Sequence, residues 1–401
     1  MNILFVTNNL YPHLNANSEI AYKLAAVLKE NHNCNVTILG YSDKERNNND
    51  NPYHVDEYEM KAIGLGRRIM ARRENRAIKF IRLLLHPAAL MYVLFPSKNS
   101  QYLLKKHYCK AIKKVVHRRN IHCLVCFKNP NDTIAGAIEA NLSAPIIAYE
   151  LDPWENEEGQ IDEMVREQQY FLEKNCAAII STMLLYKTYF ESGSRIPPER
   201  VSRAEFPNII EQKMTNASLF TDNMIHCVFT GQLYDDIRNP KFTIDLFSKL
   251  GKEGIVLDIF GNDNGCLKNI TLPENVIYHG EVMSEDATAY IMSSDVVVNI
   301  GNTLMNQMPS KILTYISTGK PILNIIKDKE CPTLKYVNKY PLAISVLESD
   351  SVTEAIVNEV GDFCRQSRGK AVEFNTIKKM YHEATPEYVG NSLFEVIMRI
   401  K

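Results

Sequence analysis

Short runs of β-branched and other apolar residues alternate with longer stretches of helical period along most of the chain. In the first half the predicted strands are 3–7, 35–39, 124–127, 146–149 and 178–181, and the predicted helices are 18–30, 101–118, 133–140 and 161–175. In the second half the predicted strands are 225–230, 256–260, 276–279, 296–300 and 321–324, and the predicted helices are 241–250, 285–293, 309–318 and 351–365. Strands that alternate with helices form parallel sheets covered on both faces, so the sequence predicts an α/β protein with two doubly wound, Rossmann-like domains.

A polar segment without clear periodicity, 205–224, separates the two halves and carries a Pro-Asn turn signal. We therefore predict one domain over 1–210 and a second over 211–375. The remaining stretch, 376–401, is helical apart from a break at Pro386, and we expect its final amphipathic helix to cross back to the first domain. Ligands of such sheets bind outside the carboxyl ends of the strands, so the two domains are expected to face each other across a ligand cleft.

Composition narrows the class of protein. The 46 basic and 47 acidic residues nearly cancel, which argues against a general polyanion binder. No apolar run approaches the roughly 20 residues of a membrane span, and the amino-terminal stretch "MNILFVTNNLYPH" is predicted to be the first strand rather than a signal peptide. Nine scattered cysteines fit a reducing compartment, so we expect a cytoplasmic protein. Cys123 and Cys126 are three apart in a predicted strand and should point to opposite faces, which favours a buried strand over a metal or redox pair.

Glycine-containing polar loops follow several predicted strands of the second half. Gly231 follows one strand and Arg238 lies farther along the same loop; Gly261 with Asn262 follows the next strand, and Gly280 the third. Glycine at these points lets a ligand approach the backbone closely. Neither G-x-G-x-x-G nor G-x-x-x-x-G-K-[ST] occurs, so the common dinucleotide and P-loop fingerprints are absent from the sequence.

The stretch "NQMPSKILTYISTGKPIL" predicts a helix that starts near Pro309 and ends at a Gly-Lys-Pro sequence. Free N–H groups in the first helical turn, with Ser310 and Lys311 beside them, could bind an anion. Every helix has such an end, so a solvated surface lysine is an equally good interpretation from physics alone.

Several motifs in order resemble a known family. The block "SSDVVVNIGNTLMNQMPSKILTYISTGKPIL", with "CVFTGQLY" and "LDIFGNDNG" upstream, resembles the donor-binding domain of GT-B glycosyltransferases, most of all the family-4 ("group 1") type of bacterial polysaccharide assembly. The resemblance covers Cys227 to Leu323. The first half, with "ILFVTNNLYPH" and "NVTIL", resembles the acceptor domain more weakly.

The resemblance implies a nucleotide-sugar donor, with its base near the Gly261 and Gly280 loops and its diphosphate at the Pro309 helix, where Arg238 and Lys311 would neutralise charge. It implies no metal and no separate cofactor, in agreement with the lack of an Asp-x-Asp motif. The donor-binding positions expected from it are Gly231, Gly261, Asn262, Gly280, Val282, Asn306, Met308, Pro309, Ser310 and Thr314.

Two departures from the family pattern stand out. The two glutamates that family members carry seven residues apart fall at Asn306 and Thr314, which hold no charge. Asn306 can still bind sugar hydroxyls by donating and accepting, but a non-catalytic paralogue acting as a partner subunit remains an alternative. The amino-terminal loop lacks the family's Gly-Gly, and its Asn15, Asn17 and Ser18 could either cap the following helix or contact the donor phosphate.

Glu150 and Asp152 follow a predicted strand beside the single tryptophan of the chain and are candidates for a base that takes a proton from an acceptor hydroxyl. We favour Asp152 over Glu150 as the base, although forming an Asp-Pro turn is the more common role for such a residue. The acceptor-side residues predicted from loops of the first half are His13, Asn15, Asn17 and Lys128.

The segment 61–119 holds sixteen basic residues and one acid, interleaved with apolar residues. This pattern predicts contact with an anionic membrane surface; a solvated basic face is the alternative, and the lack of suitably spaced aromatic residues disfavours nucleic acid. We therefore expect a glycosyltransferase at the inner face of the membrane that moves a sugar from a nucleotide diphosphate sugar to a hydroxyl of a lipid-linked glycan. A nucleotide-sugar epimerase is a further alternative.

Overall fold

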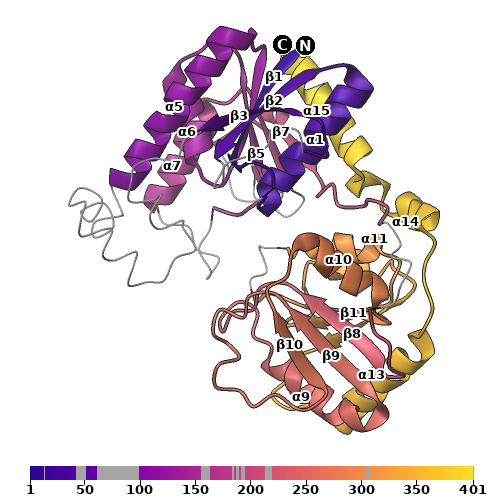
Figure 1. Cartoon of the computed structure of the whole chain (residues 1–401). Coiled ribbons are helices and arrows are strands. Elements are labelled where there is room, and N and C mark those ends of the chain that lie inside the picture. The colour runs from indigo at the N-terminus through magenta and orange to yellow at the C-terminus, as the bar shows by residue number, and fades with distance from the viewer. Residues whose placement is uncertain are drawn as a thin grey trace, which may run out of the picture. The chain divides into compact units, whose positions relative to one another are not determined.

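The computed structural model describes residues 1–12, 14–41, 51–60, 99–154, 163–182, 185–186, 189–190, 195–212, 219–303 and 308–400 (Figure 1). These residues form two compact units, one built on a seven-stranded sheet and the other on a six-stranded sheet. Every strand pairing in both sheets is parallel. The predicted α/β class with two doubly wound parallel sheets is therefore confirmed.

Unit 1 has the strand order β3-β2-β1-β4-β5-β6-β7. Its strands are β1 (Asn2–Asn9), β2 (Asn35–Tyr41), β3 (Asp56–Met60), β4 (Cys123–Phe127), β5 (Ile146–Glu150), β6 (Ala178–Thr182) and β7 (Val201–Ala204). Its helices are α1 (Ala16–His32), α5 (Asn99–Arg119), α6 (Asp132–Ala140), α7 (Glu163–Lys174), the 3-10 turn η1 (Pro198–Arg200) and α15 (Pro386–Ile400). The strand order changes direction between β1 and β4, which makes their carboxyl ends the switch point of this sheet.

Unit 2 has the strand order β10-β9-β8-β11-β12-β13. Its strands are β8 (Ile225–Thr230), β9 (Ile255–Phe260), β10 (Val276–Gly280), β11 (Val296–Ile300), β12 (Ile322–Ile326) and β13 (Ala343–Leu347). Its helices are α9 (Lys241–Leu250), η2 (Gly251–Glu253), α10 (Ser284–Ser293), α11 (Lys311–Ser317), α12 (Leu334–Val337), α13 (Glu354–Ser367), α14 (Phe374–Met380) and η3 (His382–Ala384). The switch point of this sheet lies between β8 and β11.

The boundary between the units lies at Pro207 and Asn208, and the chain returns to unit 1 at Pro386. Of the carboxy-terminal helices, α14 and η3 belong to unit 2, and only α15 belongs to unit 1. α15 packs on α1, where Gly390 is required for close approach: a Cβ there would lie 2.4 Å from Cγ1 of Val27. Proline at the first position of α15 starts a helix without losing a hydrogen bond, because that N–H has no partner within the helix.

Three of the strands that the structure describes were not predicted from the sequence, and each has a physical reason. β3 is a half-exposed edge strand of mainly charged residues, "DEYEM", so it lacks an apolar run. β7 has only four residues, and β13 ends the other sheet as an edge strand with mostly half-buried residues. The central strands, which are buried on both faces, match their predicted ranges closely because both faces impose apolar side chains.

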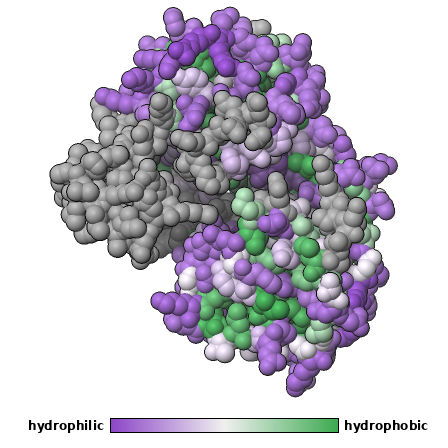
Figure 2. All heavy atoms as spheres, viewed as in Figure 1, coloured by the Kyte–Doolittle hydropathy of each residue, from purple (hydrophilic) through white to green (hydrophobic). Residues whose placement is uncertain are grey.

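Among the described residues, no helix is both long enough and apolar enough to cross a membrane. The CxxC pair lies in β4, as expected for a buried strand, and burial raises the pKa of both thiols. On the face of unit 2 seen in Figure 2, hydrophobic residues coloured green gather on part of the surface. In this unit Ile277 on edge strand β10 and Met283 after it are exposed large hydrophobic residues, at 41% and 65% exposure.

Candidate functional site

The loops at the carboxyl ends of β8, β9 and β10 are held together by backbone hydrogen bonds in unit 2. The Gly231 N–H donates to Phe260 O at 2.9 Å, and the Gly261 N–H donates to Gly280 O at 2.8 Å. Gly261 has φ +128°, and a Cβ there would lie 1.9 Å from Gly231 O. Only glycine fits this contact, so the two loops meet backbone to backbone, and we call the place where they touch the backbone surface.

Arg238 lies in the β8–α9 loop, half-buried at this edge of the sheet. Its Nε and Nη2 donate to Asn302 Oδ1 at 3.0 and 2.7 Å, and its Nη1 donates to Gln232 O at 3.2 Å. A guanidinium has five N–H groups, and no described residue accepts from the other two. No described carboxylate lies within ion-pair distance of it, and loss of hydration lowers the pKa of Arg238. The site therefore contains a positive charge that the described protein groups orient without neutralising.

The predicted helix 309–318 is shorter in the structure. α11 begins at Lys311, after Ser310 in a helical conformation whose side chain makes no capping hydrogen bond. Lys311 Nζ donates to Thr230 O at 3.2 Å, and the Tyr315 hydroxyl donates to the same oxygen at 2.6 Å. Lys311 and Tyr315 are four residues apart on one helix face, so together they tie α11 to the end of β8.

The other predicted donor residues have mixed positions. Pro309 is buried, Met308 and Thr314 are half-buried, and Asn306 lies outside the described residues. Asn262 has a structural task, since its carbonyl accepts from Leu233 N at 2.9 Å and its side chain accepts from Asn264 N at 2.8 Å.

The β10 end provides the remaining predicted donor positions. Gly280 has φ +75°, which suits glycine. Val282 and Met283 follow it and are 36% and 65% exposed, so apolar side chains lie uncovered beside the backbone surface.

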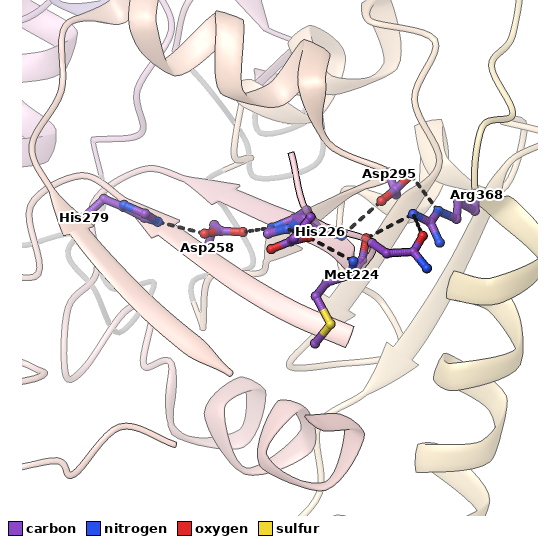
Figure 3. Close-up of polar contacts among 8 residues, drawn as sticks. Met224, His226, Asp258, His279, Asp295 and Arg368 are labelled. Carbon is purple, nitrogen blue, oxygen red and sulfur yellow. Dashed lines mark hydrogen bonds and ion pairs between the residues drawn. The ribbon is translucent and has the colours of Figure 1, made fainter. Parts of the chain in front are cut away.

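Sequence analysis missed a polar chain that crosses the sheet of unit 2 (Figure 3). Asp258 on β9 is buried, and its two carboxylate oxygens contact His226 Nδ1 on β8 and His279 Nε2 on β10, both at 2.7 Å. His226 Nε2 lies 3.0 Å from Asp222 Oδ1, so both of its ring nitrogens face a carboxylate. Burial opposes charge on His226, but these hydrogen bonds raise its pKa.

The series of polar contacts continues beyond the His226 side chain through the His226 backbone. The His226 N–H donates to Asp295 Oδ2 at 3.0 Å, and Arg368 Nε lies 3.9 Å from Asp295 Oδ1. Figure 3 shows these residues in a row from β10 to the segment after α13. The signal that could have indicated the cluster is the occurrence of His, Asp and His on three strands that pair with one another. This pattern can be recognised only when the order of those strands in the sheet is known.

In unit 1 a second group of predicted residues meets at the switch point. Asp152 Oδ2 accepts from Asn17 Nδ2 at 3.0 Å and lies 3.4 Å from Asn129 Nδ2. Lys128 Nζ donates to the Asp152 carbonyl at 2.6 Å and lies 4.0 Å from the centre of the Trp154 ring. Asp152 and Lys128 follow β5 and β4, and Asn17 lies in the first turn of α1, the helix that follows β1, as expected for side chains at one sheet edge.

Asn15 is the N-cap of α1, because its Oδ1 accepts from Ser18 N at 2.8 Å. Ser18 is buried, and its hydroxyl contacts Thr7 Oγ1 at 2.9 Å. Capping is thus what the structure shows for this loop. His13, another predicted residue, lies outside the described residues.

Glu150 ends β5 as a buried carboxylate, 1% exposed. Its Oε2 accepts from Trp154 Nε1 at 3.1 Å and from the Tyr189 hydroxyl at 2.8 Å, whereas Oε1 has no hydrogen-bond partner among the residues that the structure describes. The same hydroxyl lies 2.6 Å from Glu173 Oε1. Burial and the neighbouring Glu150 charge raise the pKa of Glu173 to about 8.

No group of three or more His, Cys, Asp or Glu side chains among the described residues is arranged to hold a metal ion. The predicted absence of a metal stays a prediction, since the described part of the chain is not the whole chain.

Comparisons with known proteins identify the fold. No protein-family model and no curated protein sequence matches this chain. Among solved structures, sucrose-phosphate synthase of Thermosynechococcus elongatus matches all of the chain and 98% of its own length, with a TM-score of 0.67 and 10% identity. Anabaena HepE in complex with UDP matches over the full length of both chains, with a TM-score of 0.65 and 11% identity. WaaG, a glycosyltransferase involved in lipopolysaccharide biosynthesis, covers 98% of this chain and 99% of its own, with a TM-score of 0.57 and 10% identity.

The chain therefore has the GT-B fold of glycosyltransferases, and this part of the sequence prediction is confirmed. Identities this low establish the fold alone. Membership of family 4 stays a prediction.

Proposed function

We propose that the protein is a glycosyltransferase that transfers a sugar from a nucleotide diphosphate sugar to a hydroxyl of a lipid-linked glycan acceptor, in bacterial polysaccharide assembly. The observation that carries the proposal is Arg238: a guanidinium with no described carboxylate partner, directed by neutral oxygens at the switch point of unit 2. Open sheets of this kind bind ligands at that place. Two solved structures with this fold support the assignment: WaaG is a glycosyltransferase, and HepE is in complex with UDP.

In this proposal the diphosphate lies against Arg238, and Lys311 adds a second charge at the start of α11. The backbone surface at Gly231 and Gly261 accepts the nucleoside, with Gly280 and Val282 at its side. Positive groups directed to the leaving diphosphate would stabilise the charge that develops as the glycosidic bond breaks. Asn306 is assigned to the donor sugar. No metal and no separate cofactor is required.

Asp152 of unit 1 is assigned as the base for the acceptor hydroxyl. Its carboxylate accepts from Asn17 and Asn129, which orient it. Glu150, by contrast, is buried and already accepts two hydrogen bonds, so it would support the position of Trp154 instead of meeting an acceptor.

Thermal-shift binding tests the donor site. UDP, GDP, dTDP, CMP and their sugars are titrated against wild type, Arg238→Ala and a matched control, Arg368→Ala, which removes an arginine at the opposite end of the strands. We expect one nucleoside diphosphate to stabilise wild type and the control, and to lose most of its effect in Arg238→Ala. If no nucleotide shifts wild type at millimolar concentration, the non-catalytic alternative replaces this proposal. Turnover of one nucleotide sugar without an acceptor would instead indicate an epimerase.

The acceptor side of the proposal places the protein at the cytoplasmic face of an anionic membrane. α5 supports this, because its inner face is apolar and buried while its outer face carries the exposed residues Lys106, Lys110, Lys113, Lys114 and Arg118. Each basic residue near an anionic surface contributes about 1 kcal/mol. The rest of the predicted segment, 61–98, lies outside the described residues.

Co-sedimentation with vesicles containing phosphatidylserine tests the membrane contact. We expect Lys110→Gln/Lys113→Gln to bind such vesicles about tenfold or more weakly than wild type. The control Lys252→Gln/Lys268→Gln removes two exposed charges from unit 2 and should bind like wild type. Equal binding of all three proteins would refute a role for α5.

A further inference from the structure

Asn302 lies in the loop after β11 and is nearly buried, at 6% exposure. Its side-chain oxygen accepts two hydrogen bonds from Arg238, through Nε at 3.0 Å and Nη2 at 2.7 Å. A guanidinium only donates, so the oxygen of this amide must be the atom that faces it. Two bonds to one acceptor fix both the position and the plane of the guanidinium.

The backbone on both sides of Asn302 is also fixed. The Gly301 N–H donates to Ile325 O on β12 at 2.8 Å, and the Thr303 N–H donates to Ile237 O in the Arg238 loop at 2.8 Å. The side chain therefore extends from a rigid support toward Arg238. This support joins the loop after β11 to the loop after β8, across the switch point of the sheet.

The chemical identity of the partner matters as much as its position. A half-buried arginine is ordinarily paired with a carboxylate, which offsets the cost of removing its charge from water. A carboxylate at position 302 could accept the same two hydrogen bonds, but it would also cancel the charge. The amide orients the guanidinium and leaves its full charge for a ligand.

We propose that Asn302 is the positioning residue of the anion site: it directs Arg238 toward a diphosphate, and its neutrality keeps the arginine charge available. This inference rests on the donor site of the proposed function and adds a residue to it. Asn302 acts through Arg238 and does not itself contact the ligand.

The test uses the full chain, two anionic probes and one neutral probe. Binding of UDP, inorganic pyrophosphate and uridine is measured by calorimetry at constant ionic strength, on wild type and on Asn302→Asp. The variant keeps the size of the side chain and an oxygen that can accept from Arg238, while it replaces the amide NH2 group by a second oxygen and adds a negative charge. We expect UDP and pyrophosphate to bind about tenfold or more weakly, as close charge pairs typically couple by at least that factor. Uridine should bind as before.

Asn223→Asp is the matched control. Asn223 also accepts from an arginine, Arg368 Nη2 at 3.3 Å, but it is exposed and precedes β8, whereas Asn302 follows β11. Asn223→Asp introduces the same charge in the same unit, but at the opposite ends of the strands. It should therefore leave the affinities for UDP, pyrophosphate and uridine unchanged. A loss of affinity in this control would mean that net charge, and not the Arg238 site, accounts for the effect.

A double-mutant cycle separates positioning from direct contact. Asn302→Ala should weaken pyrophosphate binding when Arg238 is present and have little further effect in an Arg238→Ala background, because Asn302 acts through the arginine. An effect of equal size in both backgrounds would overturn the positioning role. Circular dichroism of each variant confirms that it is folded.

The outcomes distinguish this inference from the proposed function. If pyrophosphate binds to wild type and UDP binds no better, with both weakened by Asn302→Asp, the nucleotide assignment fails while the role of Asn302 stands. If UDP binds to wild type and to Asn302→Asp equally, the role of Asn302 is wrong while the donor site stands. If wild type binds neither anion, Arg238 is not an anion ligand and the inference is overturned as well.

Discussion

The buried contact of Glu150, Tyr189 and Glu173 in unit 1 should make the stability of that unit depend on pH in a defined direction. One hydroxyl, that of Tyr189, lies 2.8 Å from Glu150 Oε2 and 2.6 Å from Glu173 Oε1. Glu173 is 2% exposed, so ionising both carboxyl groups would place two negative charges in a buried space. Burial, followed by the charge of Glu150, raises the pKa of Glu173 to about 8 from a usual value of 4.5.

The sign follows from proton linkage. Between the unfolded pKa near 4.5 and the folded pKa near 8, the folded protein holds a proton that the unfolded chain releases, so the free energy of unfolding falls as pH rises. The limiting slope for one such group is about 1.4 kcal/mol per pH unit. Glu173→Gln keeps the size of the protonated side chain and removes its titration. We expect the free energy of unfolding of the variant, relative to that of wild type, to increase by roughly 2 to 3 kcal/mol from pH 5.5 to pH 7.5.

Urea unfolding followed by the fluorescence of Trp154 measures this difference. Trp154 is the single tryptophan of the chain and donates to Glu150, so its signal reports on unit 1. Glu163→Gln is the control, because this glutamate is exposed on the same helix, α7. The comparison of variant with wild type cancels the titration of other groups. If the stability difference between Glu173→Gln and wild type is the same at both pH values, the argument that Glu173 keeps its proton in the folded protein is refuted.

Two further predictions concern unit 2. Gly261→Ala should lower the melting temperature strongly, because the new Cβ would lie 1.9 Å from a backbone carbonyl of the β8 loop. Gly265 is also at positive φ but has open space around it, so Gly265→Ala should lower the melting temperature far less. Similar melting temperatures of the two variants would contradict the close-contact argument. His226 has Asp258 and Asp222 at its two ring nitrogens, so its pKa in the folded protein, measured by NMR, should lie above 6.5. Because the folded pKa is raised, the contribution of His226 to stability should be present below pH 6.5 and be lost as pH rises through the folded pKa. A folded pKa below 6.5 would show that burial outweighs both carboxylates.

Much of the fold could be predicted from the sequence because burial imposes local patterns. β8 and β11 occupy their predicted ranges, since strands covered on both faces must be apolar throughout. The glycines after β8 and β9 were predicted to let a ligand approach the backbone, and this stays a prediction. The structure gives Gly261 another reason to be glycine, because it lies against the backbone of the β8 loop. Edge strand β3 carries no such pattern, because one side of it faces solvent.

The sequence by itself determined the alternation of strands and helices, the two parallel sheets and the edge of each sheet at which polar loops gather. The tertiary structure alone decided which of those loops meet. Arg238 and Asn302 are 64 residues apart, and they touch only because β8 lies beside β11 in the sheet. Likewise, Glu150, Tyr189 and Glu173 come from a strand end, the segment after β6 and α7. Periodicity records how each residue is buried locally, whereas the pairing of polar side chains depends on strand order, which long-range packing sets.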